Sequence, residues 1–402
     1  MRITSLMMSQ QLLYNLNNIQ ENLSTTQNEI ATGKVLNKPS DNPLAVSQDM
    51  ADSTAISQAQ SYVSNMQYGT TWMNSTSSVM QSMTSTLQSI RSVVLQALNT
   101  PGQTPNAITG LQQEVAQYIN NIYQLSDTKQ GNSYLFGGFA TDKQVSQYMT
   151  TSQLTTNISA TAASAALGLT SGGTLSIVGS QGSASVSVTT SETLTGIEAA
   201  INAVSSKTGV TATTQNGGAG VQLVLQPQDA GTAFGVSSRG ITTSGGAAFT
   251  VTSSHNSPPA GYNQAINYAV SSTVTEQVNV TAANIFATAP ATGTPDLRST
   301  LQSILNDIGN TKALGQDLAN LDANTSQLIQ TSTEVGARVN QLKTMQTQTN
   351  QFITNLQNQQ ASLENANMAQ VLTQYQNDMS TYQAALQMGA KTLLPTLAQY
   401  LP

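Results

Sequence analysis

Few residues of this chain could perform chemistry, and they are scattered along it. The 402-residue sequence contains one histidine, His255, and no cysteine. A zinc site needs several imidazole or thiolate ligands, and a triad-type nucleophile needs a base held by an orienting acid. We interpret the segment around His255, TSSHNSPPAGY, as a loop with a solvated imidazole. The sequence therefore predicts neither a metal site nor a histidine-assisted nucleophile.

Carboxylates and glycines are the other candidates for catalysis or cofactor binding. A hydrolase built on two acids stays an alternative, because the segment between Thr151 and Pro290 contains Glu192, Glu198, Asp229 and Glu276. Glu198 also has a structural interpretation, since Thr195 and Glu198 have the spacing of a helix capping box. The glycines of NGGAG precede a strand pattern and are typical of a turn. We expect no enzyme activity and no cofactor.

The composition favours assembly with partners over chemistry. Only 8% of the residues are charged, against about a quarter in ordinary globular chains. Ser, Thr, Asn and Gln can pack against a partner without the desolvation cost of ion pairs. The net charge of -6 argues against nucleic acid or an anionic membrane as a partner. No long apolar run predicts a membrane-spanning helix, and no Sec-type signal peptide is visible.

Two helical arms flank a glycine-rich insert, which holds 17 of the 28 glycines between Thr151 and Pro295. In the C-terminal arm a seven-residue apolar register, which only Thr349 breaks, is formed by Leu314, Leu321, Leu328, Val335, Leu342, Leu356 and Leu363. This coiled-coil register predicts one helix from about Asp296 to Gly389. Such a helix is about 140 Å long at 1.5 Å per residue. It needs partners along its whole length.

The N-terminal arm can supply those partners. Gly33 stands where a helix commonly ends, after one apolar stripe formed by Leu12, Leu16, Ile19, Leu23 and Ile30. Further helices are predicted from Val46 to about Leu98 and from Ala107 to about Thr128. The core of a compact bundle is an alternative interpretation of these stripes. The length of the C-terminal register favours an elongated antiparallel bundle.

The stretch KVLNKPSDNPLAV follows the first predicted helix and is unusually rich in charge and proline for this chain. Pro39 extends the residue before it, a residue among 40–42 can cap the next helix, and Pro43 suits its first turn. One interpretation is a simple helix break. The other is a loop that contacts a neighbouring subunit through Lys38 and Asp41, because the prolines could end a helix without these charges.

The insert contains one readable module and is preceded by one motif. Residues 172–226 predict the order strand, strand, helix, strand, strand. We expect this β-β-α-β-β module to close its own sheet, so that the insert could be removed without loss of assembly. The preceding GNSYLFGGF predicts a glycine turn between helix and sheet, with core anchors at Tyr134, Leu135, Phe136 and Phe139. A second interpretation is that this motif also sets the angle between bundle and insert.

Together these patterns predict an α+β fold. Both termini form an elongated antiparallel helical bundle or coiled coil, with an inserted β-rich outer domain. We expect terminal coiled-coil or disordered assembly segments at residues 1–45 and 380–402, a helical rod domain at 46–140 and 296–379, and the β-rich insert at 141–295.

The chain closely resembles the hook-associated proteins of the FlgL type, flagellin-like axial proteins of the bacterial flagellum. The motifs that carry the resemblance are MRITSLMM, TGKVLNKPSDNPLAV, GNSYLFGGF and YQAALQMGAKTLLPTLAQYLP, in this order. Residues 172–226 also look like a small repeat of flagellin and hook-associated outer domains. Pro395 and Pro402 depart from the family's usual closing SLLxYL. Flagellin, the filament subunit, is the alternative, but flagellins usually carry a SAKDDAAG-like stretch in place of NKPSDNP.

The resemblance implies a secreted structural adaptor that forms the junction layer between hook and filament. The partners it implies are the first hook–filament junction protein, flagellin, a ring of like subunits and a flagellar export chaperone, with type III export replacing a signal peptide. The subunit-assembly residues it implies are Leu12, Leu16, Ile19, Leu23, Ile30, Lys38, Asp41, Leu372, Tyr375, Tyr382 and Leu386. The domain-junction residues are Tyr134, Phe136, Gly137 and Gly138.

Overall fold

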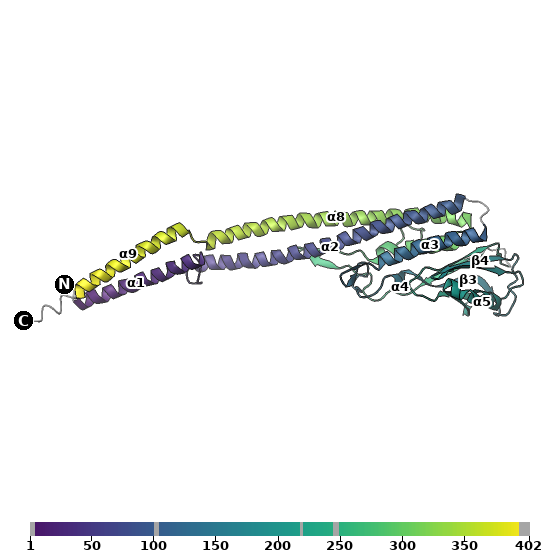
Figure 1. Cartoon of the computed structure of the whole chain (residues 1–402), viewed down its shortest axis with the longest axis horizontal. Helices are drawn as coiled ribbons and strands as arrows, with labels where there is room; N and C mark the ends of the chain where they lie inside the picture. The colour runs from purple at the N-terminus through teal and green to yellow at the C-terminus, as the bar shows by residue number, and fades with distance from the viewer. Residues whose placement is uncertain (1–4, 100–103, 218–219, 244–248, 394–402) are drawn as a thin grey trace, which may run out of the picture. The chain divides into compact units, whose positions relative to one another are not determined.

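The computed structural model describes residues 5–99, 104–217, 220–243 and 249–393, and it confirms the α+β class. Helices form both ends of the chain, and the strands lie in its middle (Figure 1). Contacts divide the chain into two compact units. Unit 1 joins Met1–Ser64 to Gln346–Pro402, and unit 2 is Asn65–Met345.

The unit boundaries fall inside two long helices, α2 (Pro43–Asn99) and α8 (Thr311–Glu364). The sequence predicted three parts with boundaries at other residues. That division describes assembly segments, rod and insert, and it stays a prediction. Pro395 and Pro402 lie outside the described residues.

The helices of the N-terminal arm form close to where the sequence predicts them. Helix α1 (Ser5–Thr32) ends at Gly33, whose φ of +71° is a left-handed conformation that glycine adopts without strain. Helix α2 starts at Pro43, and the Asn42 side-chain oxygen accepts a hydrogen bond from the Ala45 amide at 3.2 Å. Helix α3 (Pro105–Ser126) is capped by Thr104, which accepts from the Ala107 amide. Capping residue and proline thus define each start.

The single C-terminal helix expected over 296–389 is wrong, because three helices occupy that segment. They are α7 (Leu297–Asp307), α8 and α9 (Met368–Leu393). Asn310 starts α8 by accepting a hydrogen bond from the Ala313 amide at 3.4 Å. Asn367 starts α9 in the same way. The heptad register holds within α8. Its register positions in unit 2 are all buried, at Leu314, Leu321, Leu328, Val335 and Leu342.

In unit 1, α1 and α9 lie side by side (Figure 1, purple and yellow). Leu12 and Gly389 meet near the far end of the pair, where a Cβ on Gly389 would lie 2.7 Å from Leu12 Cδ2. Glycine therefore allows the two helices to approach closely. The adjoining ends of α2 and α8 share an apolar cluster of Ile56, Ala59 and Ile353.

The main part of the insert is built from two larger antiparallel sheets. One has the strand order β6-β7-β3-β9, and the other has the order β5-β4-β8. The strands are β3 (Thr151–Ala160), β4 (Gly173–Gly179), β5 (Gly182–Val188), β6 (Val210–Gly217), β7 (Gly220–Pro227), β8 (Gly235–Arg239) and β9 (Val251–His255). Helix α5 (Leu194–Ala203) adds Ile197 and Ile201 to a core shared by both sheets.

The β-β-α-β-β order of residues 172–226 is confirmed, but two details of the module differ from expectation. The hairpins β4–β5 and β6–β7 belong to different sheets, so the module does not close a sheet of its own. The cap of α5 is Thr193, which accepts a hydrogen bond from the Gly196 amide at 3.0 Å. Thr195 instead donates to the Ala163 carbonyl oxygen. The capping box predicted at Thr195 and Glu198 is therefore wrong, because the capping residue of α5 is Thr193, two residues earlier.

Buried amide side chains join the insert to the helices of unit 2. Gln112 of α3 is fully buried; it donates to the Leu305 carbonyl at 2.9 Å and accepts from the Ser176 hydroxyl. Gln302 of α7 donates to the Phe234 carbonyl at 3.0 Å and accepts from the Thr151 hydroxyl at 2.7 Å. A buried amide that lost these partners would be costly, so α3, α7 and the sheets form one core.

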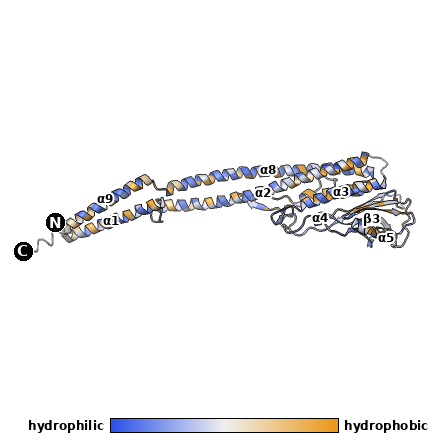
Figure 2. Cartoon of the chain, in the orientation of Figure 1, coloured by the Kyte–Doolittle hydropathy of each residue, from blue (hydrophilic) through white to orange (hydrophobic). Residues whose placement is uncertain are grey.

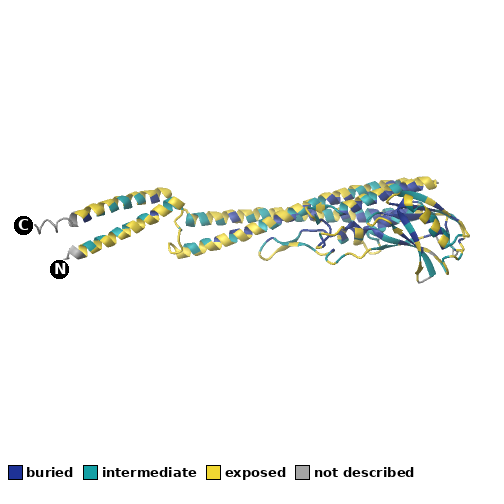
Figure 3. Ribbon diagram, turned by 60° about the horizontal axis from the view of Figure 1, so that its bottom comes forward, coloured by how far each residue is buried: buried dark blue, intermediate teal, exposed yellow. Residues whose placement is uncertain are grey.

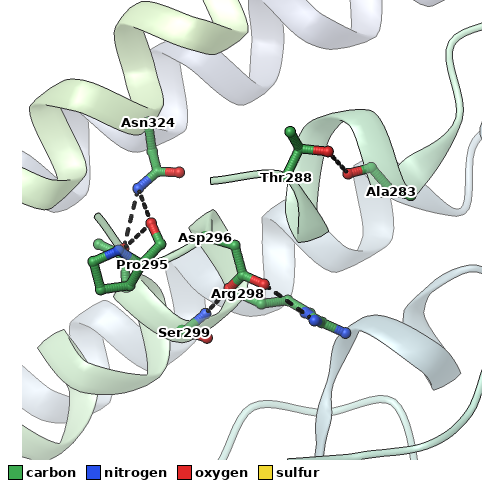
Figure 4. Close-up of polar contacts among 8 residues, drawn as sticks. Ala283, Thr288, Pro295, Asp296, Arg298, Ser299 and Asn324 are labelled. Carbon is green, nitrogen blue, oxygen red and sulfur yellow. Dashed lines mark hydrogen bonds and ion pairs between the residues drawn. The ribbon is translucent and has the colours of Figure 1, made fainter. Parts of the chain in front are cut away.

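Helix α7 is held at its start by a compact polar network (Figure 4). The Asp296 carboxylate accepts from the Ser299 amide at 2.8 Å and pairs with Arg298 at 3.1 Å. Asn324 of α8 donates to the Pro295 carbonyl at 3.1 Å. These bonds define where the chain leaves the insert. The remaining short elements are α4 (Ser146–Met149), α6 (Ser205–Thr208), the hairpins β1 (Lys129–Gln130)–β2 (Ser133–Tyr134) and β10 (Asn267–Ala269)–β11 (Thr275–Gln277), and the π-helix η1 (Ala283–Ala287).

Candidate functional site

The candidate site lies in unit 1, where both of its helical strands are interrupted at the same level. We call the segments 33–42 and 365–367 together the paired break. The Val35 amide donates to the Glu364 carbonyl at 2.6 Å, and the Ala366 amide donates to the Gly33 carbonyl at 2.9 Å. Backbone hydrogen bonds therefore join the two interruptions into one structure. We did not predict the second one from the sequence, because no proline or glycine stands there, although the apolar register ends at Leu363.

One ion pair crosses the paired break. Lys34 Nζ lies 2.5 Å from Glu364 Oε2, and the Glu364 side chain is 15% exposed while that of Lys34 is 47% exposed. An exposed pair of this kind contributes at most about 1 kcal/mol. Its value here is positional, because it holds the end of α8 against the start of the loop.

Asp41 closes the loop of the paired break from within. Its Oδ2 accepts hydrogen bonds from the Lys38 amide at 2.7 Å and from the Asn37 amide at 3.1 Å. The Asn37 side chain in turn donates to the Lys34 carbonyl at 2.7 Å. Lys38 is exposed, and it forms no ion pair within the described residues. The two charges of the motif thus differ: the Asp41 carboxylate holds the loop, while the Lys38 ammonium projects from it.

A groove of about 390 Å³ opens beside the loop, between the end of α1 and the start of α9. We call it the α1–α9 groove. Its lining includes Thr25, Glu29, Val35, Asn367, Gln370 and Gln374. Partial burial raises the pKa of the Glu29 carboxyl, and the negative charge of Asp41 raises it further. Most of the lining side chains are polar and uncharged, and Glu29 is the charged residue among them.

The assembly residues predicted from the sequence lie on α1 and α9, with different exposure. Along α1 the stripe is half-buried, at Leu12, Leu16, Ile19, Leu23 and Ile30. On α9, Tyr375 and Tyr382 are half-buried, whereas Leu372 is 44% and Leu386 is 47% exposed. Val371 is buried, although the sequence did not single it out. One apolar face of α1 thus packs within the chain, but it is incompletely covered.

Helix α1 also has exposed apolar side chains near its start, at Met7, Met8, Leu13 and Tyr14. Figure 2 shows apolar residues along both α1 and α9, and Figure 3 shows how much of both helices is exposed. The large apolar side chains classed as exposed in unit 1 are Met7, Met8, Leu13, Tyr14, Val35, Leu44, Met50, Phe352, Met368, Leu372, Leu386 and Met388. Leu44, at 82%, is the most exposed of them. The exposed apolar side chains of unit 1 are candidates for contact with another protein.

The predicted domain-junction residues form a compact turn after α3. Tyr134, Leu135 and Phe136 are buried as expected, but Phe139 is 58% exposed and is not a core anchor. The Ala282 amide donates to the Phe136 carbonyl at 2.9 Å, which joins this turn to the chain leaving the insert. The two glycines are required by space: a Cβ on Gly137 would lie 2.7 Å from the Ala140 oxygen. One on Gly138, with φ of +59°, would lie 2.3 Å from the Tyr262 oxygen.

The residues considered for chemistry are not assembled into a catalytic arrangement. His255 is not in a loop; it ends strand β9, and burial followed by the Arg298 charge lowers its pKa to about 4. The carboxyl pair that the structure does bring together is Asp307 with Asp317, which the sequence did not indicate. Burial raises the pKa of Asp317, and the neighbouring Asp307 raises it further. This pair joins the end of α7 to α8.

Neither a membrane-spanning helix nor a cluster of metal ligands occurs in the part of the chain that the structure describes. No helix there is long and apolar enough to cross a membrane. No three His, Cys, Asp or Glu residues gather in that part as metal ligands would.

Two family descriptions match this chain in separate segments. Residues 3–141 match the N-terminal helical region of bacterial flagellin, and residues 174–226 match the flagellin hook IN motif. These matches cover the N-terminal arm, including segment 33–42 of the paired break, and the module in the insert. They confirm the resemblance to the flagellin-like axial proteins of the bacterial flagellum.

The chain is also similar to a named curated protein. Flagellar hook-associated protein 3 of Escherichia coli (strain K12) is 27% identical over 143 residues, which are 35% of this chain and 45% of the relative. The chain thus matches less than half the length of that relative. Among solved structures, a flagellar hook-associated protein from Vibrio parahaemolyticus has a TM-score of 0.47 at 14% identity, with 81% of this chain and 100% of that one covered. Bacillus cereus FlgL has a TM-score of 0.38 at 14% identity, covering 79% and 99%.

Proposed function

We propose that this protein is a structural subunit of the bacterial flagellum and not an enzyme. The observation that carries the proposal is the open apolar surface of unit 1, on a chain whose matched segments are flagellin-like. In water an uncovered apolar helix face is unfavourable, and a neighbouring axial subunit would cover it. The assembly residues Leu12, Leu16, Ile19, Leu23, Ile30, Tyr375, Tyr382, Leu372 and Leu386 belong to this surface or border it.

Within that class, we infer that the chain forms the junction layer between hook and filament. The similarity to hook-associated protein 3 supports this position over that of the filament subunit. The partners would be the first hook–filament junction protein on one side, flagellin on the other and like subunits around the ring, with an export chaperone before secretion. Lys38 would take part in subunit contact, and Tyr134, Phe136, Gly137 and Gly138 would hold the domain junction. Flagellin is the alternative identity.

Deleting the gene separates these identities. For a junction protein, hooks should lack filaments while filament protein accumulates in the medium as unassembled subunits. For a flagellin, the main filament protein itself should vanish from both places. An epitope-tagged chain seen by electron microscopy gives the second readout, with label at one narrow zone beyond the hook for a junction protein. Label along the whole filament would overturn the junction assignment, and absence from flagella would overturn the structural role.

A further inference from the structure

The paired break holds two opposite charges that no salt bridge satisfies. Glu29 lines the α1–α9 groove, and Lys38 projects from the adjoining loop. Neither forms an ion pair with any residue that the structure describes. The other charges nearby have partners: Lys34 pairs with Glu364, and Asp49 accepts a hydrogen bond from Gln360 at 2.8 Å.

We propose that the Lys38 loop of one copy docks into the α1–α9 groove of a second copy of this chain, with its ammonium against Glu29. The inference rests on the proposed axial function and specifies how neighbouring subunits recognise one another. It gives the groove an occupant and Lys38 a partner.

Charge and chemistry favour this occupant. Among the described residues that line the groove, Glu29 is the charged one, so the groove favours a cation over an anion. The hydroxyl and amide groups of Thr25, Gln370 and Gln374 can accept the remaining hydrogen bonds of an ammonium group. Burial of the Glu29 carboxyl against a partner strengthens the attraction relative to an open surface pair.

The placement also indicates the kind of assembly. The loop and the groove are different surfaces, so the contact is heterologous, and repeated contacts of that type form rings or helices. Both surfaces lie at the paired break, at the same level along α1. Copies joined through them would therefore stand side by side, as neighbours within one layer do.

The absence of cysteine makes a direct test possible, since any introduced pair is the only one present. Lys38→Cys and Glu29→Cys are made as separate single variants, tagged, and co-expressed in a strain lacking the native gene. Detached flagella are then oxidised and analysed on denaturing gels. We expect dimers containing both tags. Lys38→Cys with Glu21→Cys is the matched control, because Glu21 lies on the same helix but does not line the groove, and it should give no dimer.

Exchanging the two charges measures how much the attraction between Lys38 and Glu29 contributes to assembly. Lys38→Glu and Glu29→Lys should each lower incorporation into flagella about tenfold, because each turns an attraction into a repulsion. A one-to-one mixture of the two variants should restore much of it, since each contact between two different variants pairs opposite charges and alternating copies are favoured. Rescue only in the double variant, and not in the mixture, would mean a contact within one copy and would overturn the inference. Labelled chains present in flagella without a 38–29 cross-link would also overturn it and leave the proposed function intact. Chains absent from flagella altogether would overturn both.

Discussion

Gly131 and Gly138 share a left-handed backbone but not an environment. Gly131 has φ of +62° and nothing within 4 Å of an added Cβ, whereas a Cβ on Gly138 would strike the Tyr262 carbonyl. Gly131→Ala should therefore cost only the conformational strain, about 1 kcal/mol. Gly138→Ala should cost several times more, because backbone on both sides must move. Denaturant unfolding of the two variants measures the difference; equal losses would show that the turn can relax.

The Asp307–Asp317 pair should make unit 2 sensitive to pH. Burial raises the folded-state pKa of Asp317 from its ordinary value of 3.8 to about 7. The folded state then binds more protons than the unfolded state between these values, so stability falls as the pH rises through that window. Asp317→Asn removes one of the two charges.

We expect the melting temperature of Asp317→Asn to exceed that of the wild type at pH 8 by about 3 °C, the change that ~1 kcal/mol produces in a domain of this size. The difference should shrink toward pH 4. Glu334→Gln, on an exposed part of the same helix, is the control. A constant difference in melting temperature across the pH range would contradict the explanation by the raised pKa of Asp317.

At the scale of elements, the paired break depends on Asp41 more than on Lys38. Asp41→Ala removes the acceptor of two backbone amides and should destabilise the loop by about 1 kcal/mol. Asp41→Asn keeps a side-chain oxygen and should restore much of this. Lys38→Ala should leave the isolated protein unchanged. Hydrogen exchange of residues 34–42 reports on the loop directly, and unchanged exchange in Asp41→Ala would disprove the capping role.

Helix α1 should be weakly protected in the isolated protein. Its stripe from Leu12 to Ile30 is only half-buried against α9, and a helix with one partner gains little from intrinsic propensity. Amides of residues 5–31 should exchange much faster than those of α2 in unit 2. Assembly into flagella should slow them. Strong protection in the monomer would show that α1 and α9 suffice as a stable pair.

At the scale of the whole molecule, the insert is a structural part of unit 2. Replacing residues 151–287 by a Gly/Ser linker would strip partners from Gln112 and Gln302 and open the core shared with α3 and α7. We now expect loss of unit 2 stability by about 3 kcal/mol or more, contrary to the removable insert expected from the sequence. Thermal unfolding followed by near-ultraviolet circular dichroism checks this. An unchanged unfolding transition would show that the rest of unit 2 folds without the insert, as the sequence had led us to expect.

Much of the fold follows from local sequence signals. Caps and prolines at Asn42, Pro43, Thr104 and Pro105 start helices wherever they occur, and Gly33 ends one. The pattern of apolar residues in 172–226 predicted the correct order of strands and helix. The motifs around NKPSDNP and the hook IN segment were enough to indicate the flagellin-like class.

Only the tertiary structure decided how distant segments pair. The break at residues 365–367 meets that at Gly33 through the bonds Val35–Glu364 and Ala366–Gly33, a pairing that the local cap at Asn367 does not indicate. The same holds for the division of one module between two sheets, and for the meeting of Asp307 with Asp317. Periodicity reports which face of an element is apolar, but it carries no information on which partner covers that face. That choice depends on the free energy of packing the whole chain, where contacts distant in sequence are compared with one another.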